Sequence, residues 1–193
     1  MLNSLVGIIA SSGGAVAGGA YESIASVTPS GSTNTVTFSS IPSTYASLQL
    51  RILARGTSNG GSTNPLILFM RANGDTGTNY ANHRLFTDGT VQADGTASQT
   101  RMTPAIYADS GYPANVFGVA IIDIHDYAST TRNKTVRTIS GVETNAGTTA
   151  NRLDIHSDLW MSTSAITSLT ILNNGGDNFS SSSSFALYGI KGA

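Results

Sequence analysis

Short stretches of alternating apolar and polar residues follow one another along the chain after residue 20. In the stretch SLQLRILAR, which starts at Ser47, Leu48 and Leu50 alternate with Gln49 and Arg51. Alternation with a period of two is typical of a β-strand that buries one face. No stretch shows the three-and-four apolar spacing of an amphipathic helix, so the pattern predicts an all-β protein.

Clusters of Gly, Asn, Asp and Ser separate the alternating stretches and mark their ends as turns. The apolar stretch 65–72 is typical of a strand that is buried on both faces. Pro104 interrupts another stretch and predicts a sheet edge there, because proline cannot donate to a neighbouring strand. Ten or eleven strands are expected, within residues 21–27, 33–39, 47–55, 65–72, 82–88, 99–107, 115–127, 134–142, 153–161, 166–172 and 184–191.

The fold that these strands predict is an antiparallel two-sheet jelly-roll sandwich over residues 20–193, with a short extended N-terminal arm over residues 1–19. Strands that follow one another without crossover helices pair antiparallel. A jelly roll buries a large core between two sheets and limits the number of free sheet edges. The chain has 193 residues, which suits a single domain of this kind.

The expected arm contains the apolar run Leu5–Ala10, followed by Gly, Ala and Ser. A secretion signal needs a basic start and a longer apolar core, whereas the first basic residue here is Arg51. The run is also shorter than the roughly 18 residues of a membrane-spanning helix. We therefore expect the arm to dock on a neighbouring protein chain. The side chains expected to make this contact are Leu2, Leu5, Val6, Ile8 and Ile9.

The chain carries little charge, with 11% charged residues and a net charge of −1. Nucleic acids and anionic membranes are bound by clustered Lys and Arg, so neither is an expected partner. A surface of low charge gives poor protection against self-association, which a protein inside an assembly tolerates. The absence of Cys excludes disulfides, thiolate metal sites and a Cys nucleophile.

The tripeptide Asp-Ile-His occurs twice, at residues 123–125 and 154–156. On a strand, residues two apart share a face, so each tripeptide would place a carboxylate beside an imidazole. The alternation predicts that Leu153, Ile155 and Leu159 face the core, with the polar residues outside. Two such pairs on adjacent strands would form a metal or acid–base site. We favour ordinary polar pairs, because a metal site needs further ligands and supporting residues.

No other pattern points to an enzyme. The chain has no Gly-x-Ser-x-Gly elbow, phosphate-binding loop or dinucleotide fingerprint, and we expect no catalytic residue, bound metal or cofactor. The Asp- and Asn-rich stretch 73–96 offers oxygen ligands for calcium, but its Asn-Gly and Asp-Gly pairs favour turns. Exposed aromatic rings stack on sugars, which makes Tyr107, Tyr112 and Trp160 candidate glycan contacts; packing in the core is the alternative for Trp160.

Seven stretches, taken in order, resemble a family of small structural proteins of tailed bacteriophages. The resemblance covers residues 21–192, and the family members often begin with a short apolar arm, as this chain does. An apolar residue commonly stands in the family at the position of His125, which argues against a shared role for the first Asp–His pair. The stretches are AYESIASVT, VTFSSIPSTYASLQLRILAR, NGDTGTNYANHRLF, FGVAIIDIHDYA, KTVRTISG, LWMSTSAITSLTI and SSFALYGIKG.

The resemblance implies a non-enzymatic component at the virion surface that forms a homotrimer. A capsid decoration (cement) protein would bind the major capsid protein or other virion subunits through the arm and clamp neighbours with the jelly roll. A tail or head fibre protein would instead anchor through the arm and bind host glycan with the jelly roll. We favour decoration, since the chain has no shaft between residues 1–19 and the domain.

Overall fold

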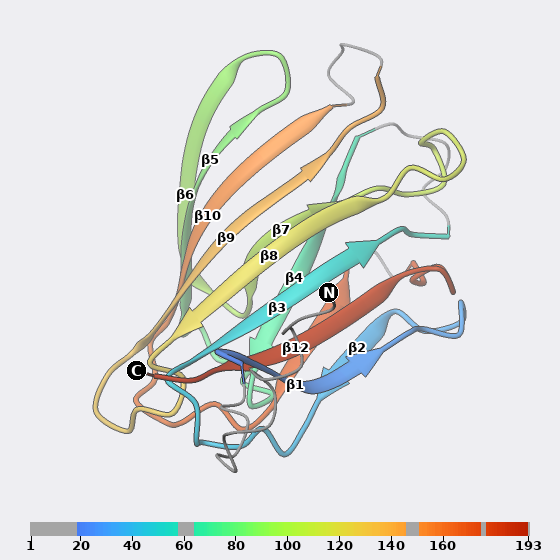
Figure 1. The fold of residues 1–193 in the computed structure, drawn as a ribbon. Coiled ribbons are helices and arrows are strands. Elements are labelled where there is room, and N and C mark those ends of the chain that lie inside the picture. Colours follow the sequence, from blue (N-terminus) through green and yellow to red (C-terminus); the bar gives the residue numbers. More distant parts are fainter. Residues whose placement is uncertain (1–18, 58–63, 146–150, 175–176, 193) are drawn as a thin grey trace, which may run out of the picture.

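The computed structural model describes residues 19–57, 64–145, 151–174 and 177–192, and these residues form two packed sheets of antiparallel strands (Figure 1). No helix occurs among them. The strands are β1 (Tyr21–Val27), β2 (Thr35–Phe38), β3 (Ser47–Ala54), β4 (Leu66–Ala72), β5 (Tyr80–Thr87), β6 (Val91–Gln99), β7 (Met102–Tyr107), β8 (Gly118–His125), β9 (Lys134–Val142), β10 (Arg152–Trp160), β11 (Leu169–Asn173) and β12 (Ser184–Ile190).

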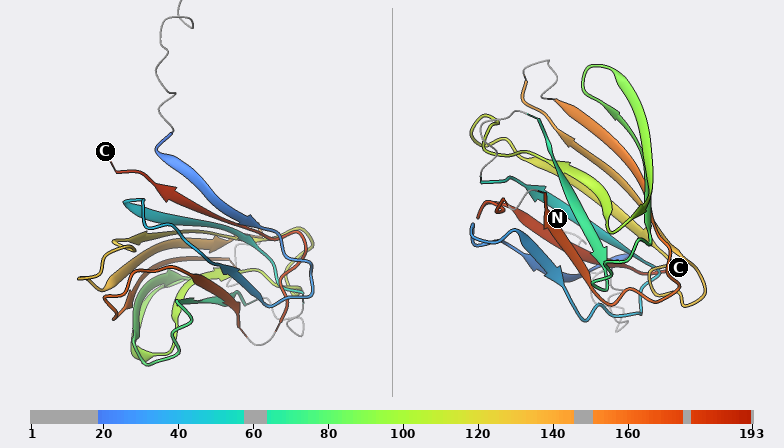
Figure 2. Two further views of the ribbon diagram at one scale, coloured as in Figure 1. Left: turned by 90° about the horizontal axis from the view of Figure 1, so that it is seen from below. Right: turned by 180° about the vertical axis from the view of Figure 1, so that it is seen from behind.

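The large sheet has eight strands in the order β1-β12-β3-β8-β9-β10-β5-β6, and the small sheet has four in the order β2-β11-β4-β7. Figure 2 shows the two layers from below and from behind. The prediction of an all-β, two-sheet antiparallel sandwich is confirmed. The predicted edge position of the Pro104 strand is also confirmed, because β7 lies at one edge of the small sheet and its pairing with β4 is irregular there.

The core lies between the two sheets and follows the alternation of the strands. In β3, Leu48 and Leu50 are fully buried, while Arg51 points outward. Aromatic rings pack against one another within this core. Phe179 packs edge-on against Phe185 with ring centroids 5.0 Å apart, and Tyr80 stacks on Trp160 at 6.4 Å. Each such ring buries about 150–250 Å², so a few of them add substantially to the core.

The stretch after β4 is a turn held by a carboxylate, as the turn interpretation predicted. Asn73 and Gly74 both have positive φ, 52° and 67°, which a two-residue hairpin-type turn requires. The Asp75 carboxylate accepts hydrogen bonds from Trp160 Nε1 at 2.7 Å and from the Gly77 amide at 2.7 Å. These bonds, with a further one from Asn79, hold the pKa of Asp75 below its usual range. Its oxygens are therefore used to fix the loop to the core.

Strand β10 has the opposite orientation to the one expected from its alternation. Leu153 and Ile155 were expected in the core but are 47% and 48% exposed, whereas Asp154 and His156 are buried. The reason lies at the end of the strand, where Trp160 shares the face of Asp154 and His156. Burying this indole against the core fixes which face of β10 points inward, and the smaller aliphatic residues turn outward.

Candidate interaction surface

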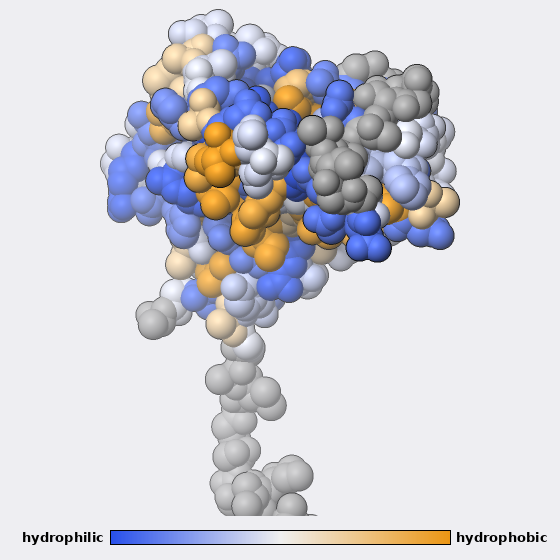
Figure 3. Space-filling model, turned by 90° about the horizontal axis from the view of Figure 1, so that it is seen from above, coloured by the Kyte–Doolittle hydropathy of each residue, from blue (hydrophilic) through white to orange (hydrophobic). Residues whose placement is uncertain are grey.

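The reversal of β10 belongs to a larger feature, an apolar surface on the side of the large sheet that faces away from the small sheet. We call it the outer apolar face. Its members come from six neighbouring strands and are each 39–77% exposed. Figure 3, a view from above, shows apolar residues in orange that reach the surface among hydrophilic ones. The eight residues are Leu53, Leu85, Val91, Val119, Ile121, Ile139, Leu153 and Ile155.

Strand register aligns these residues in two rows. In the first row, Ile121 pairs with Ile139, Ile139 with Ile155, and Ile155 with Leu85. The second row runs from Leu53 through Val119, Gly141, Leu153 and Thr87 to Val91. Residues that are directly paired across antiparallel strands share a face and lie close together. The first row is therefore a continuous line of side chains across the sheet, and the second row is interrupted only at Gly141.

A polar row borders the outer apolar face along one side. Gln49 Nε2 donates to Asp123 Oδ1 at 2.8 Å, and Arg51 Nε donates to Gln49 Oε1 at 2.8 Å. Asp123 pairs in register with Arg137, whose guanidinium donates to Ser157 Oγ. This row carries both signs of charge, and its hydrogen bonds hold the long side chains in place. The outer face thus has an apolar centre with a polar border along one side, and an apolar centre with polar surroundings is the usual composition of an interface.

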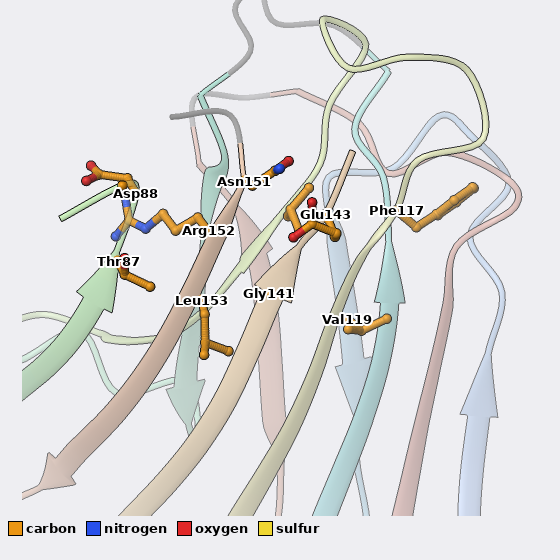
Figure 4. A pocket seen from close by; sticks show the side chains of 11 residues that line it. Thr87, Asp88, Phe117, Val119, Gly141, Glu143, Asn151, Arg152 and Leu153 are labelled. Atoms are coloured by element: carbon orange, nitrogen blue, oxygen red, sulfur yellow. The ribbon is translucent and has the colours of Figure 1, made fainter. Parts of the chain in front are cut away.

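A shallow hollow opens where the second row lacks a side chain. Gly141 lies between Val119 and Leu153, and the hollow beside it has a volume of about 910 Å³. Figure 4 shows Leu153 and Val119 on the two sides of Gly141, with Asn151 and Glu143 towards the loop end. Asp88 and Arg152 add charge at the border of the hollow. The site combines apolar walls with a few polar groups, as binding sites commonly do.

The two Asp-Ile-His tripeptides do not form one cluster. Asp123 and His125 lie on the outer side of β8, whereas Asp154 and His156 point inward from β10. The four side chains are therefore separated by the thickness of the sheet. Across the described ranges, no group of three His, Cys, Asp or Glu residues is arranged to hold a metal ion.

The inward pair is a closed ion pair. Arg152 donates to both oxygens of the Asp154 carboxylate, at 2.6 and 2.8 Å, and His156 Nε2 lies 3.2 Å from Oδ2. Burial raises the pKa of Asp154, but the bonds to His156 and Arg152 outweigh it and hold the pKa below its usual range. Asp154 is 0% exposed, so no substrate reaches its carboxylate. The arrangement can stabilise the sheet but offers no accessible acid or base.

Asp158 is the second inward carboxylate of β10, and it gives a pH-dependent prediction. Burial raises the pKa of Asp158 to about 6, although the Thr103 amide donates to it at 2.9 Å. A raised pKa in the folded state means that this group's stabilisation is complete below the unfolded pKa of about 4 and is lost as the pH rises to 6. We expect Asp158→Asn to abolish this contribution.

The measurement is urea unfolding of the wild type and Asp158→Asn at several pH values. The wild type should lose up to about 3 kcal/mol relative to the variant between pH 4 and pH 7, since one pKa unit corresponds to about 1.4 kcal/mol. A difference between the two proteins that stays constant across this range would contradict the assignment.

The aromatic residues proposed as glycan contacts require a correction. Tyr107, Tyr112 and Trp160 are at most 3% exposed, so their rings cannot stack on a sugar. The Tyr107 hydroxyl donates to Asn173, and Trp160 is fixed to Asp75. The physical reason is size, because a large ring contributes most when it is buried with a partner for its polar atom. The alternative of core packing was the correct one for Trp160.

The contact residues predicted from the sequence differ from the contact surface that the structure shows. The expected arm residues Leu2, Leu5, Val6, Ile8 and Ile9 lie outside the described residues. The outer apolar face was not predicted at all, since alternation alone does not say which face of a strand is buried. A signal was present in the sequence, because Leu153, Ile155 and Leu159 of β10 alternate with its Trp160, so the strand cannot bury both sets against the core.

Comparisons with known proteins found no relative. No family model matches the chain, and neither a curated protein nor a solved structure does. Within the described residues, no helix is long and apolar enough to cross a membrane.

Proposed function

We propose that the chain is a non-enzymatic structural protein of a bacteriophage particle, and that it decorates the capsid and stabilises the major capsid shell. The observation that carries this proposal is the outer apolar face, with eight half-exposed aliphatic side chains in two rows. Such a surface is costly in water and is typical of a protein that works through contact with other proteins. The resemblance of the seven sequence stretches to phage structural proteins supplies the kind of assembly.

In this proposal the sandwich is an enlarged jelly roll, and its two parts have separate tasks. Residues 1–19 are the arm that docks on the shell, through Leu2, Leu5, Val6, Ile8 and Ile9. The sandwich, residues 20–193, lies at the particle surface and contacts neighbouring subunits. A closed homotrimer would cover the free edges of the large sheet at β1 and β6, which would otherwise be open to unwanted strand pairing.

A second candidate is a fibre or appendage protein that binds host-surface carbohydrate. The hollow beside Gly141 favours it, because Asp88 and Asn151 supply carboxylate and amide groups for sugar hydroxyls. The two candidate functions differ in the part of the particle to which the arm binds. A decoration protein anchors on the capsid lattice, whereas a fibre protein anchors at a tail or portal attachment point.

The arm assignment predicts the result of charging its apolar side. In Leu5→Asp/Ile8→Asp, two side chains that should be buried on the shell become charged. Burial of each aliphatic side chain contributes about 1.5–3 kcal/mol, so we expect at least a hundredfold weaker binding to capsids that lack the protein. Co-sedimentation with such capsids measures the affinity directly.

The control for this experiment is Ser4→Asp/Ser11→Asp, which adds the same charge to the same segment. It should bind nearly as well as the wild type. Equal binding by all three proteins would reject the arm as the anchor. Host-glycan binding by a wild type that ignores capsids would instead favour the fibre candidate.

A further inference from the structure

We propose that the outer apolar face is the contact between two copies of this chain, which pack their large sheets against one another face to face. This inference goes beyond the proposed function, which assigns the arm to the shell but names no occupant for the face. It concerns described residues alone and does not require the protein to belong to a phage.

The size of the outer apolar face fits a second copy. Its eight aliphatic residues are 39–77% exposed and together present apolar surface on the order of 600 Å², at the upper limit of what monomers expose. A stable protein–protein contact buries roughly 800 Å² on each partner. The polar row beside the face supplies the remaining area as a rim. A small ligand would leave most of these side chains in water.

The shape also points to a sheet as the occupant. The two rows extend over strands β3, β8, β9, β10, β5 and β6, which at about 4.8 Å per strand spans roughly 24 Å. A single extended peptide covers one line of side chains and would leave the second row exposed. Two sheets that pack face to face interdigitate their side chains over both rows at a separation of about 10 Å. The partner that matches this surface is another broad apolar sheet face.

The charges around the face are compatible with contact between the same face of two copies. None of the eight residues is charged, so the centre carries no repulsion. In the polar row, Asp123 stands directly opposite Arg137 in register, and the chain as a whole has a net charge of −1. In a two-fold contact, the same patch is used by both copies, so that an acidic position of one can face a basic position of the other. A strongly charged partner would find few complementary charges on this face, so it would bind weakly.

The missing side chain at Gly141 gives the contact a specific feature. Its neighbours in the row, Val119 and Leu153, stand on either side of the hollow. An aliphatic side chain of the second copy can enter between them. Gly141 also lies close to the backbone of the neighbouring strand β10, since a Cβ atom there would be 3.2 Å from the Arg152 carbonyl oxygen. The site therefore favours glycine, which keeps the hollow open.

The test is the oligomeric state of the full-length protein, measured by sedimentation equilibrium. We expect the wild type to form a dimer or a larger closed assembly at micromolar concentrations. Ile121→Lys/Ile155→Lys places two charges in the first row, on strands that β9 separates and at positions that are 43% and 48% exposed in the single chain. Folding should tolerate them, whereas the contact should weaken at least a hundredfold.

Two further variants make the result decisive. Met161→Lys/Ser164→Lys adds the same charge at exposed positions outside the face and should assemble like the wild type. Leu85→Thr/Ile155→Thr keeps strand-compatible side chains but removes apolar surface, and it should also dissociate. Melting curves confirm that each variant is folded. A wild type that is monomeric at about 100 µM, or face variants that assemble normally, would overturn the proposal.

The arm variant Leu5→Asp/Ile8→Asp separates this inference from the proposed function. It should remain assembled even where it no longer binds capsids, because the face does not involve residues 1–19. If the arm variant dissociates while the lysine variant of the face does not, the arm of a neighbouring chain holds the copies together and the face-to-face contact is wrong. If the arm variant loses only capsid binding and stays assembled, the result supports the face-to-face contact between copies.

Discussion

Replacing Asp154 with alanine is expected to lower the free energy of unfolding by about 3–5 kcal/mol, because a buried charge would lose its partner. The carboxylate is 0% exposed, and Arg152 donates to both of its oxygens at 2.6 and 2.8 Å. Without it, the Arg152 guanidinium and His156 stay inside the protein without their acceptor. For a chain of this size, the loss corresponds to a melting temperature lower by about 6–20 °C.

The matched control is Asp94→Ala. Asp94 also forms an ion pair, with Arg84 at 2.6 Å, but its side chain is 48% exposed. An exposed pair contributes at most about 1 kcal/mol, so this variant should melt within a few degrees of the wild type. Thermal unfolding of the two variants side by side measures the difference. If both variants showed equally small effects, the ion pair of Asp154 would not contribute to the stability of the sheet as proposed.

The Asp154 contribution has a defined pH dependence. Because the pKa of Asp154 in the folded protein is below its usual range, its stabilisation is complete above the unfolded pKa of about 4. The stabilisation is lost as the pH falls through the folded pKa. The direction is opposite to that of Asp158, whose stabilisation is lost as the pH rises towards 6. Acid unfolding of the wild type therefore starts below the range in which Asp158 titrates.

Gly118→Ala is expected to cost at least about 3 kcal/mol, because a methyl group would overlap the backbone of the facing sheet. A Cβ atom at Gly118 would lie 2.4 Å from Tyr107 Cα and 3.0 Å from the Ala108 amide nitrogen. Backbone atoms of β7 cannot move aside as the end of a flexible side chain can. Gly118 therefore fixes the close approach of β8 to β7 between the two layers.

Gly192→Ala is the control for this clash. Its new methyl group would meet only the Ala46 side chain, at 3.5 Å, which is an ordinary contact. It should change the free energy of unfolding by less than about 0.5 kcal/mol. Urea unfolding of the two variants gives both values. A Gly118→Ala protein as stable as the control would contradict the close packing of β7 on β8.

Much of the fold could be predicted from local pattern. Alternation and one continuous apolar run predicted ten or eleven strands, and the expected ranges overlap eleven of the twelve strands found in the described residues. Pro104 correctly predicted an edge position for β7. Strand β6, Val91–Gln99, was missed, because its residues are exposed on both faces and show no apolar alternation. It is a strand only because β5 pairs with it, and pairing partners are a tertiary property.

The candidate surface could not be predicted for a related reason. A strand with apolar residues on one face and polar residues on the other has two possible orientations, and the majority of apolar residues suggested the wrong one for β10. Trp160 decides the orientation, and the Arg152–Asp154 pair makes the polar side acceptable in the interior. The outer apolar face then arises from register across five further strands, which no single stretch of sequence contains.

The central claim is that the chain works as a structural subunit of a virion through its arm. The most direct test is cryo-electron microscopy of purified particles of the phage to which this account assigns the chain, with residues 1–19 traced into density. The account predicts the sandwich at regular positions on the capsid surface, with the apolar side of the arm against the major capsid protein. Particles that lack the chain altogether would contradict the account.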